Sequence, residues 1–369
     1  MFNNIYKDKK IIVTGNTGFK GSWLSLWLHE LGARVTGISK DIPTSPSLFK
    51  ELELEKKTAH HFANICDGAR MKEIFAQVQP DFVFHLAAQP IVSVSYEDPI
   101  ETFQTNTMGT ANILEALKTI TGPCHAVIIT SDKCYDNVEW IWGYRERDPL
   151  GGKDPYSASK AAAEMVIKTY FHSYFNKPGS KVRLTTVRAG NVIGGGDWAL
   201  NRIVPDCFRS WNDQRAVRIR NPHSTRPWQH VLEPLSGYLR AGQMLAETTS
   251  GDIHGEPFNI GPSAEQNHTV LELLQAVKTF WKSGSVKEYF EISDNRGFHE
   301  AGLLKLNCDK ALYYLQWKPA LDFAATARFT GEWYNHYYNN GKKGISSYTV
   351  HQIQEYTEAA REKSIAWVL

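Results

Sequence analysis

Residues 10–31 read KIIVTGNTGFKGSWLSLWLHEL and decide the fold of this 369-residue chain. A short β-branched run leads directly into glycines in a GxxGxxG spacing, and a helical segment follows. Such glycines allow a tight turn and a close approach of the backbone, while free N–H groups at a helix start attract a pyrophosphate. The stretch therefore predicts a strand, a dinucleotide-binding turn and a helix. The predicted cofactor contacts in this turn are Gly15, Thr17, Gly18, Phe19, Lys20 and Gly21.

The first half of the chain continues this alternation of β-branched runs and helical stretches. We expect strands at residues 10–13, 34–38, 61–65, 81–86, 126–130 and 184–188. Residues 23–31 carry Trp23, Leu24, Trp27, Leu28 and Leu31 at helical spacing, which predicts an amphipathic helix. Repeated strand–helix units indicate an α/β fold with a doubly wound, parallel sheet of the Rossmann type.

The pattern changes after residue 191, where glycines and prolines separate short pieces rich in arginine and tryptophan. We expect residues 1–191 to form a dinucleotide-binding domain. Residues 192–369 should form mainly a smaller, mixed α/β substrate domain. A segment near residues 229–265 is expected to return to the first domain, with a strand at residues 257–261 that rejoins the main sheet. Helices are expected over residues 269–281 and 323–338.

Charge and cysteine usage exclude several classes of function. The chain has 41 basic and 39 acidic residues, so it lacks the broad positive field of nucleic-acid-binding proteins. It shows no signal-peptide pattern and no apolar run near the ~18 residues of a membrane span. Its five cysteines form no CxxC pair, which argues against disulfides and metal ligation. We therefore expect a cytoplasmic protein without a metal, a nucleic-acid partner or a membrane partner.

Residues 154–160 read DPYSASK and contain the candidate catalytic pair. Asp154 and Pro155 predict a helix start, so that Tyr156 and Lys160 project from the same face. A nearby ammonium group and a nicotinamide cation would both favour the tyrosinate over the phenol, whose ordinary pKa is ~10. In isolation the YxxxK pattern is common and more often marks a packed aromatic ring and a solvated lysine. Its place after the fifth strand of a dinucleotide-binding fold favours the catalytic interpretation.

Three polar residues follow that fifth strand, at the sheet edge where such folds bind ligands. Ser131 is expected to hydrogen-bond a substrate hydroxyl or Tyr156, with an ordinary turn residue as the alternative. Asp132 and Lys133 are candidates for an acid–base pair, with a solvated ion pair at a surface turn as the alternative.

The end of the second strand leaves the choice between NAD and NADP open. Ser39 stands where an acidic residue often binds the adenosine ribose. Asp41 is either a ribose ligand or a solvated turn residue, and Lys40 would suit a 2′-phosphate.

Together these segments resemble the extended short-chain dehydrogenase/reductase family over nearly the whole chain. The motifs that carry the resemblance are TGNTGFKG (14–21), HLAA (85–88), TNTMGT (105–110), PYSASK (155–160) and LQWKP (315–319). Within the family, the chain is most similar to the dehydratases that act on CDP-glucose. That similarity rests on residues 15–23, 131–133, 194–198 and 225–231.

The resemblance implies a homodimer or homotetramer that retains NAD⁺ and converts CDP-glucose to CDP-4-keto-6-deoxyglucose for bacterial surface polysaccharides. It also implies a set of cofactor contacts: Ser39, Asn64, Ile65, Leu86, Ala87, Ala88, Asn106, Tyr156 and Lys160. The implied ligands of the nucleotide diphosphate are Asn191, Arg202, Arg218, Arg226, Arg296 and His299. Guanidinium groups match phosphate oxygens, although each arginine equally fits a surface salt bridge. Relatives usually carry histidine at the position of Asn16, which leaves the turn feasible but bears on cofactor affinity.

The reaction implied by the resemblance has three steps. Tyr156 removes the O4 proton as C4 gives up a hydride; water is then lost across C5 and C6; finally the hydride returns to C6. The similar dTDP-glucose dehydratases place an Asp–Glu pair at C5 and C6, where this chain has Asp132 and Lys133. Either this pair shares one proton in a dry pocket, or Lys133 stays charged and stabilises the C5 enolate.

Two other functions compete with this one. A nucleotide-sugar 4-epimerase shares the oxidation at C4 but has no use for an acid–base pair at C6. A non-catalytic dinucleotide-sensing protein typically loses the tyrosine or the lysine, and both are present here.

Overall fold

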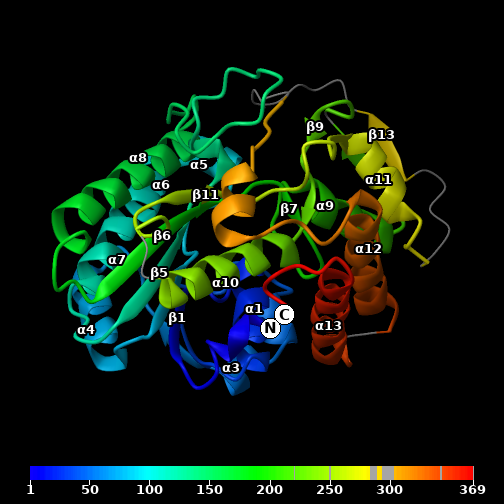
Figure 1. Cartoon of the computed structure of the whole chain (residues 1–369). Coiled ribbons are helices and arrows are strands. Elements are labelled where there is room, and N and C mark those ends of the chain that lie inside the picture. The colour runs from blue at the N-terminus through cyan, green and yellow to red at the C-terminus, as the bar shows by residue number, and fades with distance from the viewer. Residues whose placement is uncertain (220, 249–250, 283–288, 293–302, 341–342, 369) are drawn as a thin grey trace.

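The computed structural model describes residues 1–219, 221–248, 251–282, 289–292, 303–340 and 343–368. Its centre is a sheet of seven parallel strands in the order β11-β6-β5-β4-β1-β2-β3 (Figure 1). The strands are β1 (Lys10–Thr14), β2 (Arg34–Ser39), β3 (Ala59–Phe62), β4 (Phe82–His85), β5 (Cys124–Ile129), β6 (Val182–Arg188) and β11 (Pro257–Asn259). The order changes direction between β1 and β4, so the expected doubly wound sheet is confirmed. In such sheets ligands bind at the carboxyl ends of the strands where the order reverses.

Helices cover both faces of the sheet. One face packs against α4 (Gly68–Val78), α7 (Gly109–Leu117) and α8 (Pro155–Tyr170), and the other against α1 (Phe19–Glu30) and α10 (Leu232–Glu247). Alternate residues of each strand enter the two hydrophobic layers; in β1, Ile12 faces the first layer while Ile11 and Val13 face the second. The layers hold the strand ends rigidly at one edge, where the site lies.

Outside the two layers and before residue 191 the remaining helical segments are short, and one further π-helical turn lies at residues 311–315. They are α2 (Leu48–Glu51), α3 (Leu54–Lys57), α5 (Val92–Glu97), α6 (Pro99–Phe103), the 3-10 turns Phe2–Asn4 and Asp132–Cys134, and the π-helical turns Gln104–Met108, Phe171–Phe175 and Ala311–Leu315.

Two local predictions are wrong. The third strand ends at Phe62, because Asn64 accepts hydrogen bonds from Cys66 N and Asp67 N through its side chain and carbonyl, and these bonds form a turn. Asn64 and Ile65 therefore follow the strand. Helix α1 is not amphipathic, since all residues from Gly21 to Leu28 are buried. Its outer face is covered by α13 and α3, segments distant in sequence.

Besides α10, β11 and the π-helical turn Ala311–Leu315, the described part of the chain after residue 191 contains three short strand pairs and four helices. The pairs are β7 (Val192–Ile193) with β10 (Gln229–His230), β8 (Val217–Ile219) with β13 (Phe290–Ile292), and β9 (Thr225–Arg226) with β12 (His268–Thr269). The helices besides α10 are α9 (Ile203–Asn212), α11 (Val270–Lys278), α12 (Phe323–Asn339) and α13 (Ile345–Glu362). The strand expected at residues 257–261 forms as β11 and pairs with β6, beside which it lies in Figure 1.

The two ends of the chain meet on the same side of the molecule (Figure 1). The ring of Phe2 stacks on Trp367 at 5.0 Å, and the Phe2 amide donates to the Trp367 carbonyl. Within the described ranges, no helix combines the length and apolar composition needed to cross a membrane.

Candidate active site

The glycine turn packs against the turn after β4 and leaves no room for side chains between them. Gly15 has a φ of +74°, and a Cβ on it would lie 2.8 Å from the Ala87 nitrogen. A Cβ on Gly21 would lie 2.0 Å from the Gly15 carbonyl oxygen. Thr14 Oγ1 accepts hydrogen bonds from the amides of Leu86 and Ala87, both at 3.1 Å. The turn therefore forms a backbone-lined cradle that opens at the start of α1.

Ser39 braces this turn from β2. Its hydroxyl donates to Asn16 Oδ1 at 2.9 Å and accepts from the Thr17 amide at 3.3 Å. The fully buried Asn16 side chain fills the space above Gly37, where a Cβ would lie 2.0 Å from Asn16 Nδ2. Asn16 is thus directed toward β2, and the turn keeps its shape without the histidine of relatives.

The turn after β4 is tied to α8 by Asn106. The Asn106 amide donates to Ser159 Oγ at 2.9 Å, and its carbonyl oxygen accepts from the Gln89 amide at 2.8 Å. Ala88 precedes Gln89 in this turn and is half-buried. Ile65 packs against Gly109 at the start of α7, and a Cβ on Gly109 would lie 2.5 Å from the Ile65 side chain.

Tyr156 and Lys160 lie in the first turns of α8, which begins as expected. Asp154 caps the helix by accepting from the Ser157 amide at 2.9 Å. Tyr156 is 8% exposed and Lys160 is 5% exposed. Burial raises the pKa of Tyr156 to about 12, against a hydrogen bond with Ser131 that lowers it. Burial lowers the pKa of Lys160 to about 8, against a raising effect of the Glu164 carboxylate.

Asp132 lies in the 3-10 turn after β5 and is 2% exposed. Its Oδ1 accepts from Ser131 Oγ at 3.1 Å, whereas its Oδ2 is buried and lacks a hydrogen-bond partner. Burial raises the pKa of this carboxyl, although the neighbouring Lys133 and Ser131 act in the opposite direction. Lys133 is only partly buried. The structure therefore places a buried carboxyl group with a raised pKa next to a partly buried lysine.

Asp132 contributes to the wall of a small pocket. Gly190, Gln229, Gly261 and Lys305 contribute to its wall. Gln229 donates from Nε2 to the Gly190 carbonyl at 2.8 Å, which leaves its buried Oε1 without a partner. Asp132 and Gln229, which both line the pocket, thus each keep one buried oxygen without a hydrogen-bond partner.

Two further charged residues, Arg202 and Lys20, interact with members of this group. Arg202 pairs with Asp197 at 2.8 Å, and its charge lowers the pKa of Tyr156. Lys20, at the start of α1, donates to the hydroxyl of the fully buried Tyr238 at 3.4 Å. Burial, followed by the charges of Arg202 and Lys160, lowers the pKa of Lys20 to about 8.

Tyr238 and Gln229 are the site residues that sequence reasoning missed. The phenol of Tyr238 lies within electrostatic range of Tyr156 and Asp132. It occurs in α10, which reads as an ordinary apolar helix, so no local signal marks it. Gln229 lies in the TRPWQHV segment (225–231), and this motif is the sequence feature that could have pointed to it.

The remaining predicted substrate ligands are scattered. Asn191 follows β6 with a φ of +47°, and its carbonyl accepts from the Gln229 amide. Arg226, on β9, donates to the Thr225 carbonyl at 2.8 Å. Arg218, on β8, is 82% exposed and lies 3.7 Å from Glu291. Arg296 and His299 lie outside the described residues.

The parallel sheet, the glycine turn and the adjoining tyrosine–lysine pair define an extended short-chain dehydrogenase/reductase. The profile of the GDP-mannose 4,6 dehydratase family matches residues 12–330, and the chain belongs to this family. It is 47% identical over 334 residues to the CDP-glucose 4,6-dehydratase of Salmonella typhimurium, covering 90% of this chain and 92% of the relative.

Solved structures agree on the fold. The epimerase Mth375 of Methanothermobacter thermautotrophicus superposes with a TM-score of 0.77 at 21% identity, covering 92% of this chain and 96% of that one. The dTDP-glucose 4,6-dehydratase of Bacillus anthracis, solved in complex with NAD, gives a TM-score of 0.70 at 20% identity, covering 88% and 96%.

Proposed function

We propose that the protein is an NAD-dependent dehydratase that converts CDP-glucose to CDP-4-keto-6-deoxyglucose and water. The observation that carries the proposal is the buried Asp132 carboxyl group, which lies within electrostatic range of Tyr156 and has one unpartnered oxygen. Oxidation at C4 requires the tyrosine alone, whereas loss of the C6 hydroxyl requires an additional acid. The 47% identity to a CDP-glucose 4,6-dehydratase supports the same substrate.

The residues around the glycine turn fit a dinucleotide. The cradle between Gly15 and Ala87 excludes side chains, and it opens at the N-terminus of the 12-residue helix α1, whose free amides suit a pyrophosphate. Lys40 forms an ion pair with Glu101 at 3.1 Å, which offsets the positive charge that a 2′-phosphate would need. This pairing favours NAD over NADP. Bound NAD⁺ supplies the hydride acceptor at C4 and, once reduced, the hydride donor at C6.

Tyr156 removes the O4 proton in the oxidation step. Burial raises the pKa of Tyr156, and the positive charge of a bound nicotinamide would lower this pKa. The Ser131 hydroxyl positions the phenol, and the nearby charge of Arg202 favours the tyrosinate. Lys160, on the same helix face, contributes a second positive charge while it is protonated.

Asp132 acts in the elimination step by giving a proton to the departing C6 hydroxyl, which leaves as water. The C5 proton, which the 4-keto group acidifies, passes to the Asp132 carboxylate, and this is the proton that Asp132 gives to the C6 hydroxyl; a proton from solvent returns to C5 when the hydride reaches C6. Lys133 keeps part of its side chain in solvent. Because solvent stabilises an ammonium group, this position favours a charged Lys133 that stabilises the C5 enolate over a neutral base.

The phosphate contacts remain part of the proposal. Arg202 has the strongest support, because it lies close to Tyr156, while Asn191 and Arg226 flank the pocket residues Gly190 and Pro227 in sequence. Arg218, Arg296 and His299 remain predictions from the resemblance. The same holds for the division at residue 191, for a homodimer or homotetramer, and for a cytoplasmic enzyme that serves surface-polysaccharide synthesis.

A panel of nucleotide sugars tests the proposal. The protein is incubated with NAD⁺ and, separately, CDP-, dTDP-, UDP- and GDP-glucose, and the products are identified by NMR. We expect a 4-keto-6-deoxyhexose from CDP-glucose. Formation of a galactose derivative instead would identify a 4-epimerase, and no turnover of any of the four sugars would contradict the proposal.

A further inference from the structure

One buried arginine lies between the two halves of the site. Arg188, at the end of β6, forms a two-pronged ion pair with Glu164, with Nε–Oε1 at 2.9 Å and Nη2–Oε2 at 2.8 Å. The side chains are 3% and 5% exposed. Glu164 lies one helical turn after Lys160 on α8, and its carboxylate raises the pKa of Lys160. The first half of the guanidinium thus contacts the helix that carries the tyrosine–lysine pair.

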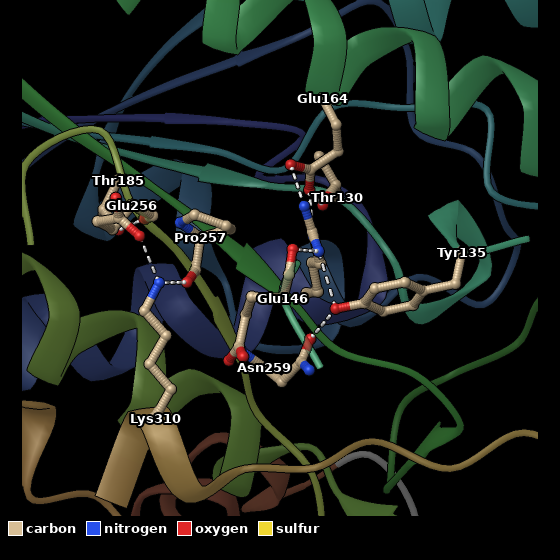
Figure 2. A network of polar contacts seen from close by, with 10 residues as sticks. Thr130, Tyr135, Glu146, Glu164, Thr185, Glu256, Pro257, Asn259 and Lys310 are labelled. Carbon is tan, nitrogen blue, oxygen red and sulfur yellow. Dashed lines mark hydrogen bonds and ion pairs between the residues drawn. The ribbon is translucent and has the colours of Figure 1, made fainter. Parts of the chain in front are cut away.

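The second half of the guanidinium contacts the loop that carries Asp132. Its Nη1 donates to the Tyr135 hydroxyl at 2.8 Å and to the Glu146 carbonyl at 3.1 Å. Figure 2 shows this chain of contacts from Glu164 to Tyr135. Tyr135 directly follows the 3-10 turn of Asp132 and Lys133, and its ring is 1% exposed.

From Tyr135 the contacts continue to the wall of the pocket. The Tyr135 hydroxyl donates to Asn259 Oδ1 at 2.7 Å (Figure 2). Asn259, at the end of β11, donates from Nδ2 to the carbonyls of Tyr144 at 2.8 Å and Asn307 at 3.1 Å. Residues 305 and 306, immediately before Asn307, line the pocket.

We propose that Arg188 is a positioning residue that aligns the oxidation half of the site, on α8, with the elimination half, on the Asp132 loop. Tyr135 and Asn259 extend this alignment to the substrate pocket. A buried ion pair is by itself weak support for stability or function. Here, however, the hydrogen bonds of the guanidinium go to Glu164 on α8 and to Tyr135 and Glu146, in the segment that follows the Asp132 turn. This inference rests on the proposed function.

The first test is Tyr135→Phe, which keeps both charges and the ring but removes the hydroxyl. The hydroxyl joins Arg188 to Asn259, so its loss should loosen the Asp132 loop and leave α8 in place. We expect elimination, followed as deuterium exchange at C5, to slow about 10- to 100-fold, because small displacements of catalytic groups have effects of this size. Formation of reduced nicotinamide in a single turnover should be unchanged.

The second test is Glu164→Gln, which acts on the oxidation half of the site, on α8. It removes the carboxylate that raises the pKa of Lys160, so the rate of nicotinamide reduction should fall off at a lower pH than in the parent protein. A purely structural loss would lower the rate at all pH values without moving the profile. Because this variant leaves the Arg188 charge unpaired and endangers folding, Tyr135→Phe keeps the inference testable.

Thr185→Val serves as the matched control. Thr185 also lies on β6, and its hydroxyl donates to the carbonyl of Glu256, the residue before β11, at 2.7 Å. The Glu256 side chain is in turn bound by Lys310 (Figure 2). The change removes one buried hydroxyl bond, as Tyr135→Phe does, and should leave both steps unaffected. If Tyr135→Phe and Thr185→Val behave alike, the alignment role is refuted.

Amide hydrogen exchange separates this inference from the proposed function. In the protein without substrate, Tyr135→Phe should speed the exchange of amides in residues 132–136 and 303–308, while Thr185→Val should not. Unchanged exchange in these segments would overturn the alignment even if the parent enzyme dehydrates CDP-glucose. Absence of the dehydrated product in the parent, with faster exchange in the variant, would overturn the proposed function alone.

Discussion

The carboxyl group of Asp132 lies directly against Gly190, so closely that a Cβ on the glycine would be 1.8 Å from Oδ2. Gly190 has an ordinary backbone angle, and space alone explains the glycine at this position. Any side chain here would move the acid away from the substrate.

Gly190→Ala should therefore lower dehydration by roughly 100-fold, the loss expected when a catalytic group is displaced by about 1 Å. The variant should still reduce bound NAD⁺ with CDP-glucose, because Tyr156 is untouched. Product formation and nicotinamide absorbance measure the two steps separately. Gly122→Ala is the control, since a Cβ there meets nothing within 4 Å. Equal loss of both steps in Gly190→Ala would argue against a local effect on Asp132.

Asp132→Asn should separate oxidation from elimination more sharply. The amide has nearly the same shape but cannot give a proton to the C6 hydroxyl, so elimination should fall by about 10²- to 10⁴-fold. Reduced nicotinamide should then accumulate with the 4-keto sugar in a single turnover. Rapid formation of the 6-deoxy product by this variant would exclude Asp132 as the acid.

Lys133→Met tests the two roles of the rim lysine. If Lys133 is the base, the variant should lose exchange of the C5 hydrogen with D₂O. If its charge only stabilises the enolate, exchange should slow without disappearing, because another group removes the proton. NMR of the sugar recovered from D₂O measures the exchange, and an undiminished rate rules out the lysine in both roles.

Glu233 predicts how stability depends on pH. This carboxyl is 1% exposed and accepts from the Ala320 and Leu321 amides and from the Tyr356 hydroxyl, and burial raises its pKa to about 7. An unfolded glutamate has a pKa near ~4.3. Between these values the folded protein holds a proton that the unfolded chain has released, so stability should decline as pH rises through this window.

Glu233→Gln removes this decline. Gln keeps an acceptor for the two amides, and its Nε2 would donate to the Tyr356 hydroxyl, which lies 2.9 Å from Ser236 Oγ and can donate there instead. The difference in unfolding free energy between the variant and the parent protein should shift in favour of the variant by up to about 3 kcal/mol between pH ~4 and pH ~7, from the size of the pKa shift. Denaturant unfolding at the two pH values measures this; parallel curves would contradict the pKa assignment.

The sequence predicts the sheet well because its signals are local. β-branched runs mark β1, β2, β4, β5 and β6, and residues 154–157 contain the signals for the start of α8. It predicts less where distant segments meet. The burial of both faces of α1 depends on α13, more than 300 residues away, and the end of β3 depends on a side-chain turn at Asn64.

The same distinction applies to the site. Tyr156, Lys160, Ser131 and Asp132 belong to sequence motifs, and the structure places Ser131 and Asp132 within interaction range of Tyr156. Tyr238, Gln229 and Arg188 reach the site only through packing of α10, β10 and β6, and no pattern near them reports those contacts. Such residues are found from the fold rather than from spacing.

The late return of β11 to the central sheet bears on how the protein is made. While a ribosome has released only the first two hundred residues or so, β6 has an open side with unpaired amides and carbonyls, a surface prone to aggregation. Three residues encoded much later, 257–259, close that side, and Asn259 then completes the hydrogen bonds of Tyr135. The nascent N-terminal half is therefore not a self-sufficient folding unit, and fragments that stop before residue 257 should need chaperones to stay in solution.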